Sequence, residues 1–166
     1  TDKVLEYGAG AGTLVHNWEV KTGIKPECLE IDNGLRKILI DRGFKCYDKA
    51  ESITKTYDEI YTSNVLEHIE DDVEALKKIH AMLKPDSILV IYVPAFMCLY
   101  SELDSSVGHY RRYHKKELIE KLKKNKYEVI DLYYVDSIGF FASLAIKFFG
   151  YKRNLKLGSS KESLLI

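Results

Sequence analysis

The stretch VLEYGAGAGT, residues 4–13, decides the fold class of this 166-residue chain. Four residues of strand character run directly into a turn with glycine at alternating positions, Gly8, Gly10 and Gly12. Such a turn at the start of a helix lets backbone N–H groups come close to a ligand. A dinucleotide fingerprint would place its third glycine at position 13, where this chain has Thr13. The stretch therefore predicts a strand, a ligand-binding turn and a helix, with a spacing that departs from the dinucleotide pattern.

Short β-branched or aromatic runs alternate with amphipathic stretches along the rest of the chain. This alternation is typical of βαβ units, which build a parallel sheet with helices on both faces. We predict a doubly wound, Rossmann-like α/β sheet that is mostly parallel. The predicted strands are residues 3–7, 27–31, 45–47, 59–63, 87–93 and 128–134. The predicted helices are residues 71–83 and 115–126. We expect Pro85 to end the first of them, because proline disfavours helical geometry at the preceding residue.

The length suits one domain, and no internal repeat or glycine-rich linker divides the chain. We expect a single domain over residues 1–166 that has lost sequence at both ends, because a strand-like run begins by Val4. Residues 151–166 contain no convincing seventh strand, so that strand is either missing or replaced by a local pairing. Residues 95–113 lack a clean period and 138–150 are strongly apolar, and we expect both segments to act as caps or lids on the substrate side.

Composition excludes several classes of protein. Basic and acidic residues number 25 each, so the chain is no polycation built to coat nucleic acid. The three cysteines, Cys28, Cys46 and Cys98, are scattered and form no CxxC pair, which predicts reduced thiols in a cytoplasmic setting. The longest apolar run, residues 138–149, contains Lys147 and is shorter than the ~20 residues that span a bilayer.

An acidic residue follows the glycine turn at the distance that nucleotide-binding sheets use. Glu30 ends the second predicted strand, in the run CLEID, and an acid there accepts both hydroxyls of a ribose. The glycine turn and Glu30 together therefore predict a nucleoside site. Asp32 either shares the ribose role or caps the next helix, and both alternatives stay open.

Four segments in sequence order resemble the class I S-adenosylmethionine-dependent methyltransferases. They are VLEYGAGAG, CLEID, YDEIYTSNVLEHIED and LKPDSILVIYVP, and the resemblance runs from about Lys3 to Tyr134. A later run, GHYRRYHKKEL, looks like a small-molecule branch of that family with a GHYRRY signature, a branch associated with glycan and lipid modification. The resemblance implies S-adenosylmethionine as cofactor and methyl transfer as activity.

The resemblance also implies which residues hold the cofactor. Asp48 matches an acidic contact to the adenine amino group, although Ala50–Ser52 fits the family pattern in a slightly shifted register. The implied cofactor-binding residues are Glu6, Gly8, Gly10, Gly12, Glu30, Ile31, Asp48, Asn64 and Val65.

Methyl transfer from a sulfonium depends mainly on aligning the acceptor with the methyl group and excluding water. An oxygen acceptor also has to lose its proton, and a histidine is the natural base near neutral pH. His68 and His109 are the two candidate catalytic residues. The alternatives are that His68 is a helix-entry residue bonded to backbone and that His109 belongs to a solvated basic turn.

The run Gly108–Tyr113 is the candidate substrate segment. Arg111 and Arg112 could clamp an anionic group in bidentate fashion, and Tyr110 and Tyr113 could supply flat apolar walls. We therefore expect a small acceptor that is anionic, glycosylated or lipid-linked. Residues 138–149 either cap the pocket, pair with a partner, or form an interfacial helix that gives peripheral membrane contact.

Two other functions stay open: a cofactor-binding, non-catalytic partner subunit and an NAD-dependent oxidoreductase. Thr13 and the motif at residues 64–71 disfavour the oxidoreductase. No cluster of His, Cys, Asp and Glu has metal-ligand spacing along the sequence, so no metal is predicted. The acceptor and the oligomeric state are left undecided by the residues.

Overall fold

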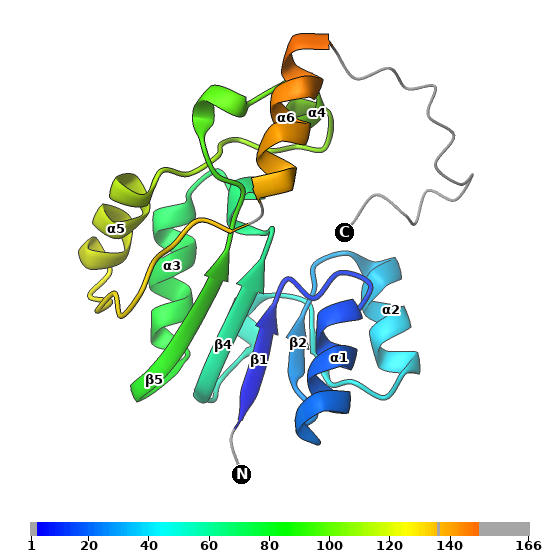
Figure 1. Cartoon of the computed structure of the whole chain (residues 1–166). Helices are drawn as coiled ribbons and strands as arrows, with labels where there is room; N and C mark the ends of the chain where they lie inside the picture. The colour runs from blue at the N-terminus through cyan, green and yellow to red at the C-terminus, as the bar shows by residue number, and fades with distance from the viewer. Residues whose placement is uncertain (1–2, 136, 150–166) are drawn as a thin grey trace. The chain divides into compact units, whose positions relative to one another are not determined.

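The computed structural model describes residues 3–135 and 137–149, which include a parallel β-sheet (Figure 1). The described part of the chain contains five strands in the order β3-β2-β1-β4-β5, and every neighbouring pair is parallel. The chain crosses from β3 to β4 so that β4 lies beside β1, which is the strand-order reversal where such sheets bind ligands. The strands are β1 (Val4–Tyr7), β2 (Glu27–Leu29), β3 (Cys46–Tyr47), β4 (Tyr57–Ser63) and β5 (Leu83–Tyr92).

Helices alternate with these strands, as the sequence predicts. Of the helices beside the sheet, α1 and α2 cover one face and α3 the other (Figure 1). The helices are α1 (Thr13–Thr22), α2 (Asn33–Asp41), α3 (Asp72–Ala81), α4 (Glu102–Ser106), α5 (Lys115–Lys124) and α6 (Ser137–Phe149). Short 3-10 turns cover Ala50–Ser52, Leu66–His68 and Met97–Leu99. The segment 95–113, predicted to be irregular, thus holds one short turn and the five-residue α4.

The chain divides into two compact units. We call Thr1–Leu66 with Glu74–Tyr92 the sheet unit, and Glu67–Val73 with Val93–Ile166 the helical unit. All strands of the described sheet belong to the sheet unit. The expectation of one domain, shortened at both ends, stays a prediction.

The core of the sheet unit forms where the central strands and the first two helices meet. All four residues of β1 are buried, as expected for a strand covered on both faces. On the α1–α2 side, buried hydrophobic residues from several elements pack together in one cluster. Its members are Ala9, Val15, Cys28, Leu39 and Phe44, with Cys46 packed against them.

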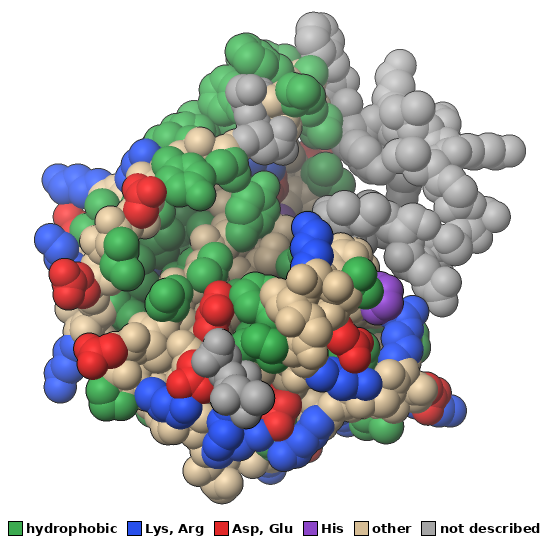
Figure 2. Space-filling model, turned by 60° about the horizontal axis from the view of Figure 1, so that its bottom comes forward, with side chains coloured by type: hydrophobic (Ala, Val, Ile, Leu, Met, Phe, Trp, Pro, Cys, Tyr) green, Lys and Arg blue, Asp and Glu red, His purple; other side chains and the backbone are tan. Residues whose placement is uncertain are grey.

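One face of the sheet-edge strand β5 is apolar and exposed. Its alternate residues Ile88, Val90 and Tyr92 are 49%, 47% and 43% exposed. Hydrophobic side chains gather on one side of the space-filling view (Figure 2). No described helix is long and apolar enough to cross a membrane.

Strand β5 begins at Leu83, four residues before the predicted start at Ser87. Tyr57 pairs with Leu83 and Glu59 with Ile88, so β5 carries extra residues in a bulge. Pro85 is tolerated because a bulge does not require its missing N–H, and Asp86 takes a positive φ of 60° beside it. Helix α3 ends at Ala81, two residues before the predicted end at Leu83, and Pro85 lies inside β5, so proline is not what ends the helix.

The predicted strand at residues 128–134 is wrong, because this segment has no strand structure. Its aromatic and β-branched residues fit a strand, but a strand also needs a neighbouring edge for its backbone hydrogen bonds. Instead Tyr134 accepts a 3.3 Å hydrogen bond from the Lys115 N–H and packs its ring 4.4 Å from that of Phe96. Ile130 remains 85% exposed. The sheet in the described residues therefore ends at β5.

Candidate functional site

The glycine turn is held against the end of β2 and against the turn that follows β4. The N–H groups of Gly8 and Ala9 both donate to the carbonyl of Leu29, at 2.9 and 3.0 Å. Gly8 has a φ of +82°, and a Cβ there would lie 2.3 Å from Cγ2 of Val65. Only glycine fits this position, since both the conformation and the contact exclude a side chain. The glycine turn therefore packs closely against Val65, in the turn that follows β4.

Gly10 is different, because it faces open space. It also has a positive φ, 53°, but a Cβ there would meet no atom within 4 Å. Its N–H donates a 2.7 Å hydrogen bond to Oε2 of Glu30, and the Asp32 N–H donates to Oε1 at 2.8 Å. Two backbone hydrogen bonds therefore fix the buried Glu30 carboxylate. It lies beside the Gly10 backbone, where there is space for a ligand.

Ile31 comes directly after Glu30, and its apolar side chain is 79% exposed. This exposed side chain, two residues after β2 ends, offers one wall of an apolar ligand surface. Asp32 accepts a 2.9 Å hydrogen bond from the Leu35 N–H and caps α2. The capping alternative for Asp32 is therefore the one that the structure supports.

Glu6 lies within β1, just before the glycine turn, and is 2% exposed. The Tyr61 hydroxyl donates to its Oε2 at 2.9 Å, and the Tyr61 ring stacks on Trp18 at 4.9 Å between centroids. Burial raises the pKa of Glu6 to about 7, against the opposing effect of the Tyr61 hydrogen bond. Glu6 thus links β1 to β4 as a buried acid that titrates near neutral pH.

The remaining predicted cofactor residues lie after β3 and β4. Asn64 follows β4 with a positive φ of 52°, and its N–H donates to the Tyr92 carbonyl at 2.9 Å. Asp48 follows β3, is exposed, and accepts a 3.0 Å hydrogen bond from the Ser52 hydroxyl. Ser52 is in the alternative register, so the choice between Asp48 and Ala50–Ser52 stays open. The predicted cofactor residues all belong to the sheet unit, at or near the carboxyl ends of its strands.

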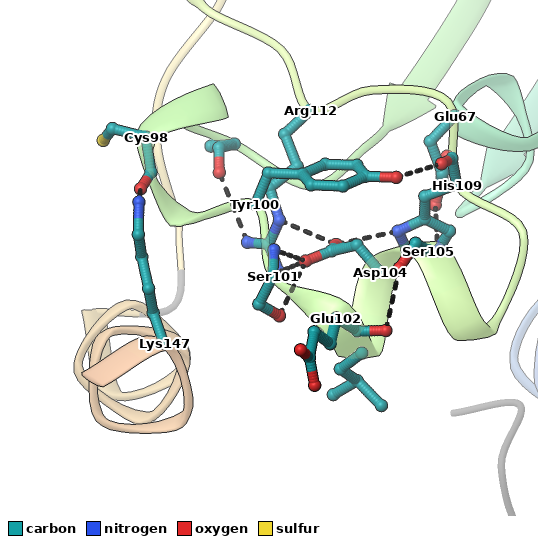
Figure 3. Close-up of polar contacts among 12 residues, drawn as sticks. Glu67, Cys98, Tyr100, Ser101, Glu102, Asp104, Ser105, His109, Arg112 and Lys147 are labelled. Carbon is teal, nitrogen blue, oxygen red and sulfur yellow. Dashed lines mark hydrogen bonds and ion pairs between the residues drawn. The ribbon is translucent and has the colours of Figure 1, made fainter. Parts of the chain in front are cut away.

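In the helical unit, a buried acid missed by the sequence analysis organises the candidate substrate segment. Asp104 is 2% exposed and binds Arg112 through two hydrogen bonds, Nε to Oδ1 at 2.8 Å and Nη2 to Oδ2 at 3.1 Å (Figure 3). Nδ1 of His109 lies 2.9 Å from the same Oδ1. Burial raises the pKa of Asp104, but the hydrogen bonds from Arg112 and His109 outweigh it, so the pKa lies below its usual range.

The other arginine of the segment, Arg111, is also paired with a buried acid. Arg111 forms a 2.9 Å ion pair with Asp72 and donates to the carbonyls of Ile69 and Glu70 at 3.0 and 2.6 Å. The Tyr113 hydroxyl also donates to Asp72, at 2.8 Å, and Tyr113 is 2% exposed.

These contacts revise the expectation of an anion clamp. Arg111 is ion-paired with Asp72 and Arg112 with Asp104, and the Tyr113 side chain is buried. The two arginines therefore hold the segment in place. Of the predicted substrate residues, Tyr110 is the exposed one, at 51%.

The two candidate catalytic histidines lie together in the helical unit. The His68 and His109 rings meet edge to face, with centroids 4.5 Å apart. Burial lowers the pKa of His68, and the neighbouring His109 lowers it further. Glu67, which the sequence analysis did not single out, lies 4.0 Å from Nε2 of His109 through its Oε1. Its only signal in the sequence was its place in the NVLEHIED motif.

The two segments predicted as caps border one hollow. It has a volume of about 510 Å³ and lies within the helical unit. Its lining comes from both segments: Tyr100, Ser101, Glu102, Leu103, Ser105, Ile146 and Lys147. The Lys147 ammonium donates to the Cys98 carbonyl across them (Figure 3).

The sequence model of a family described as a methyltransferase domain matches residues 1–139. The chain belongs to this family. A search of curated proteins by sequence finds no match.

Solved structures share the fold of this methyltransferase domain at low identity. Phosphoethanolamine N-methyltransferase 2 from Haemonchus contortus, determined with S-adenosylmethionine, has a TM-score of 0.72 and 16% identity over 89% of this chain and 38% of its own. The cyclopropane synthase MmaA2 from Mycobacterium tuberculosis has a TM-score of 0.65 and 12% identity, over 78% and 56%. The [4+2]-cyclase SpnF has a TM-score of 0.64 and 20% identity, over 78% and 52%. The chain thus spans 38–56% of these proteins, and they support a Rossmann-like methyltransferase core.

Proposed function

We propose that this methyltransferase domain binds S-adenosylmethionine at the carboxyl ends of β1, β2 and β4 and transfers its methyl group to a small molecule. The observation that carries the proposal is the open Gly10 backbone beside the anchored Glu30 carboxylate. Membership of the methyltransferase domain family supports the reaction. The small-molecule acceptor is supported by the relative named for phosphoethanolamine methylation.

The residues fit the chemistry of the cofactor. A ribose needs an acceptor for two hydroxyls, and the Glu30 carboxylate is that acceptor. Adenine needs an apolar surface, which the exposed Ile31 side chain offers. The ammonium of the methionine part needs carbonyl acceptors, which the backbone of the glycine turn carries. The N–H groups of Gly8, Ala9 and Gly10 are already bonded to Leu29 and Glu30.

When bound, the cofactor supplies a methyl group that is already activated for displacement. The work left to this chain is to orient the acceptor, exclude water and, for a hydroxyl acceptor, take up a proton. Asp104 holds Nδ1 of His109, which leaves Nε2 of that ring as the candidate proton acceptor. His68 is the second candidate.

The acceptor side is proposed to be the helical unit, from residues 95–113 and α6. The hollow of about 510 Å³ bordered by both segments supports this. Peripheral membrane contact through residues 138–149 also stays a proposal, supported by the 82%, 65% and 74% exposure of Ile138, Phe141 and Phe148. Location in a reducing compartment stays a prediction as well, with Cys28 buried and Cys98 exposed as free thiols.

Calorimetry with S-adenosylmethionine, S-adenosylhomocysteine and NAD tests the cofactor. We expect both sulfur-containing ligands to bind and NAD to give no heat. Transfer of a labelled methyl group to a metabolite extract then tests the reaction. Binding without transfer would favour the non-catalytic partner subunit, and binding of NAD alone would favour the oxidoreductase.

A further inference from the structure

Glu67, which the proposed methyl transfer does not use, lies beside the two candidate catalytic histidines of the helical unit. Glu67 and His68 are neighbours in the chain, and His109 lies about forty residues later, yet one ligand atom from each lies within 4.8 Å of the others. Glu67 is buried, and the two histidines are half-buried. Carboxylate oxygen and imidazole nitrogen are both common metal ligands.

The Glu67 carboxylate lacks the partners that a buried acid needs. Its side chain is 0% exposed, and neither oxygen has a hydrogen-bond partner among the described residues. The other two buried acids in the described part of the helical unit are well paired: Asp72 binds Arg111, Lys121 and Tyr113, and Asp104 binds Arg112 and His109. Burying a charged carboxylate without partners costs folding free energy, so Glu67 has to be neutralised by a cation or a proton.

The histidine beside Glu67 is oriented as metal-binding histidines are. Nδ1 of His109 is held by the Asp104 carboxylate at 2.9 Å, so Nε2 is the nitrogen with a free lone pair. That Nε2 is the atom 4.0 Å from Oε1 of Glu67 (Figure 3). A carboxylate that holds the far nitrogen of a ligand histidine is the usual second layer of a metal site. The His68 ring completes the group from its position against His109.

We propose that Glu67, His68 and His109 bind a divalent transition-metal ion. Two imidazoles and one carboxylate suit zinc, and also cobalt, manganese or iron, better than calcium or magnesium. Metal bonds of about 2.0–2.1 Å would bring tetrahedral ligand atoms to roughly 3.3 Å from one another, so Glu67 and His109 have to approach by less than ~1 Å. Three protein ligands leave a fourth position open. With the metal bound, Nε2 of His109 is a ligand and no longer a free base.

Cobalt(II) is the probe, because its visible absorption reports the ligand set directly. The whole chain is treated with a chelator, freed of it, and titrated with Co²⁺ by absorption and by calorimetry. We expect one Co²⁺ per chain, displaced by Zn²⁺. Glu67→Gln and His109→Asn should each weaken binding by at least tenfold. His16→Asn is the matched control, since His16 is exposed on α1 in the sheet unit, and it should change nothing.

Two results would overturn the site: no Co²⁺ binding by the wild type, or unchanged affinity in Glu67→Gln. Either would leave a proton on Glu67 as its neutralising partner. If Glu67→Gln fails to fold, His68→Asn supplies the same comparison at a more exposed position. S-adenosylhomocysteine binding in the same samples separates this proposal from the cofactor site, because the three ligands lie in the helical unit and the cofactor residues in the sheet unit.

Discussion

The backbone N–H of Gly10 donates a 2.7 Å hydrogen bond to Oε2 of Glu30, twenty residues further along the chain. This bond joins the glycine turn after β1 to the end of β2, where the ligand of a doubly wound sheet binds. It sets the Glu30 carboxylate before any ligand arrives, and a preset acceptor loses little entropy on binding.

Replacing Glu30 with glutamine should weaken cofactor binding. The amide keeps one acceptor for the Gly10 and Asp32 N–H groups but removes the charge that strengthens bonds to ribose hydroxyls. Loss of hydrogen bonds to a charged group costs about 1.5–3 kcal/mol, or roughly tenfold to a hundredfold in Kd. Calorimetry with S-adenosylhomocysteine measures this. Glu74→Gln, an exposed acid paired with Lys77 on α3, is the control. Equal affinity in Glu30→Gln and wild type would remove Glu30 from the site.

Alanine at Gly8 and at Gly10 should separate folding from binding. Both positions have positive φ, which costs about 1–2 kcal/mol for an alanine. At Gly8 the new Cβ also meets Val65 at 2.3 Å, which adds about 1–3 kcal/mol of overpacking. Urea unfolding should therefore show Gly8→Ala as the less stable variant, while Gly10→Ala folds and loses cofactor affinity. Equal destabilisation in the two variants would contradict the Val65 contact.

Glu6 should make the protein less stable as the pH rises from about 4.5 to 7. Its pKa is about 7 in the folded chain and about 4.5 in the unfolded chain, so in this range only the folded state holds the proton. Stability then falls with rising pH, on the order of 2 kcal/mol over the window. In Glu6→Gln this part of the slope should vanish, leaving the variant more stable than wild type at pH 8. Urea unfolding from pH 4 to 8 measures the difference, and parallel curves for the two proteins would refute it.

Replacing Arg112 should lower the stability of the fold, whether or not a substrate is present. Arg112→Ala leaves the buried Asp104 without its bidentate partner, and breaking a buried pair costs about 3–5 kcal/mol. The stability of Arg112→Lys should lie between those of the wild type and Arg112→Ala, because an ammonium keeps the charge but cannot reproduce the two parallel hydrogen bonds. Lys116→Ala, at an exposed position of α5, is the control and should change stability by less than about 0.5 kcal/mol. Thermal unfolding distinguishes this from an anion clamp, for which Arg112→Ala would keep wild-type stability.

Five strands, the glycine turn and the position of Glu30 could all be predicted from the residues, for a local reason. Val4–Tyr7 is a strand because its own side chains favour one, and the turn that follows needs glycine at Gly8. Once the strands are parallel, their carboxyl ends must lie at one edge of the sheet, so the predicted cofactor residues are brought together by topology alone.

The tertiary structure decided what depends on partners distant in the sequence. Residues 128–134 have the composition of a strand but do not pair with the sheet. The charge of Arg111 is paired with Asp72, 39 residues earlier in the chain. Glu67 and His109 are about forty residues apart, and no spacing rule links them. Backbone preference acts within a few residues, whereas the pairing of charges and strand edges acts through space, and only the folded chain shows which groups meet.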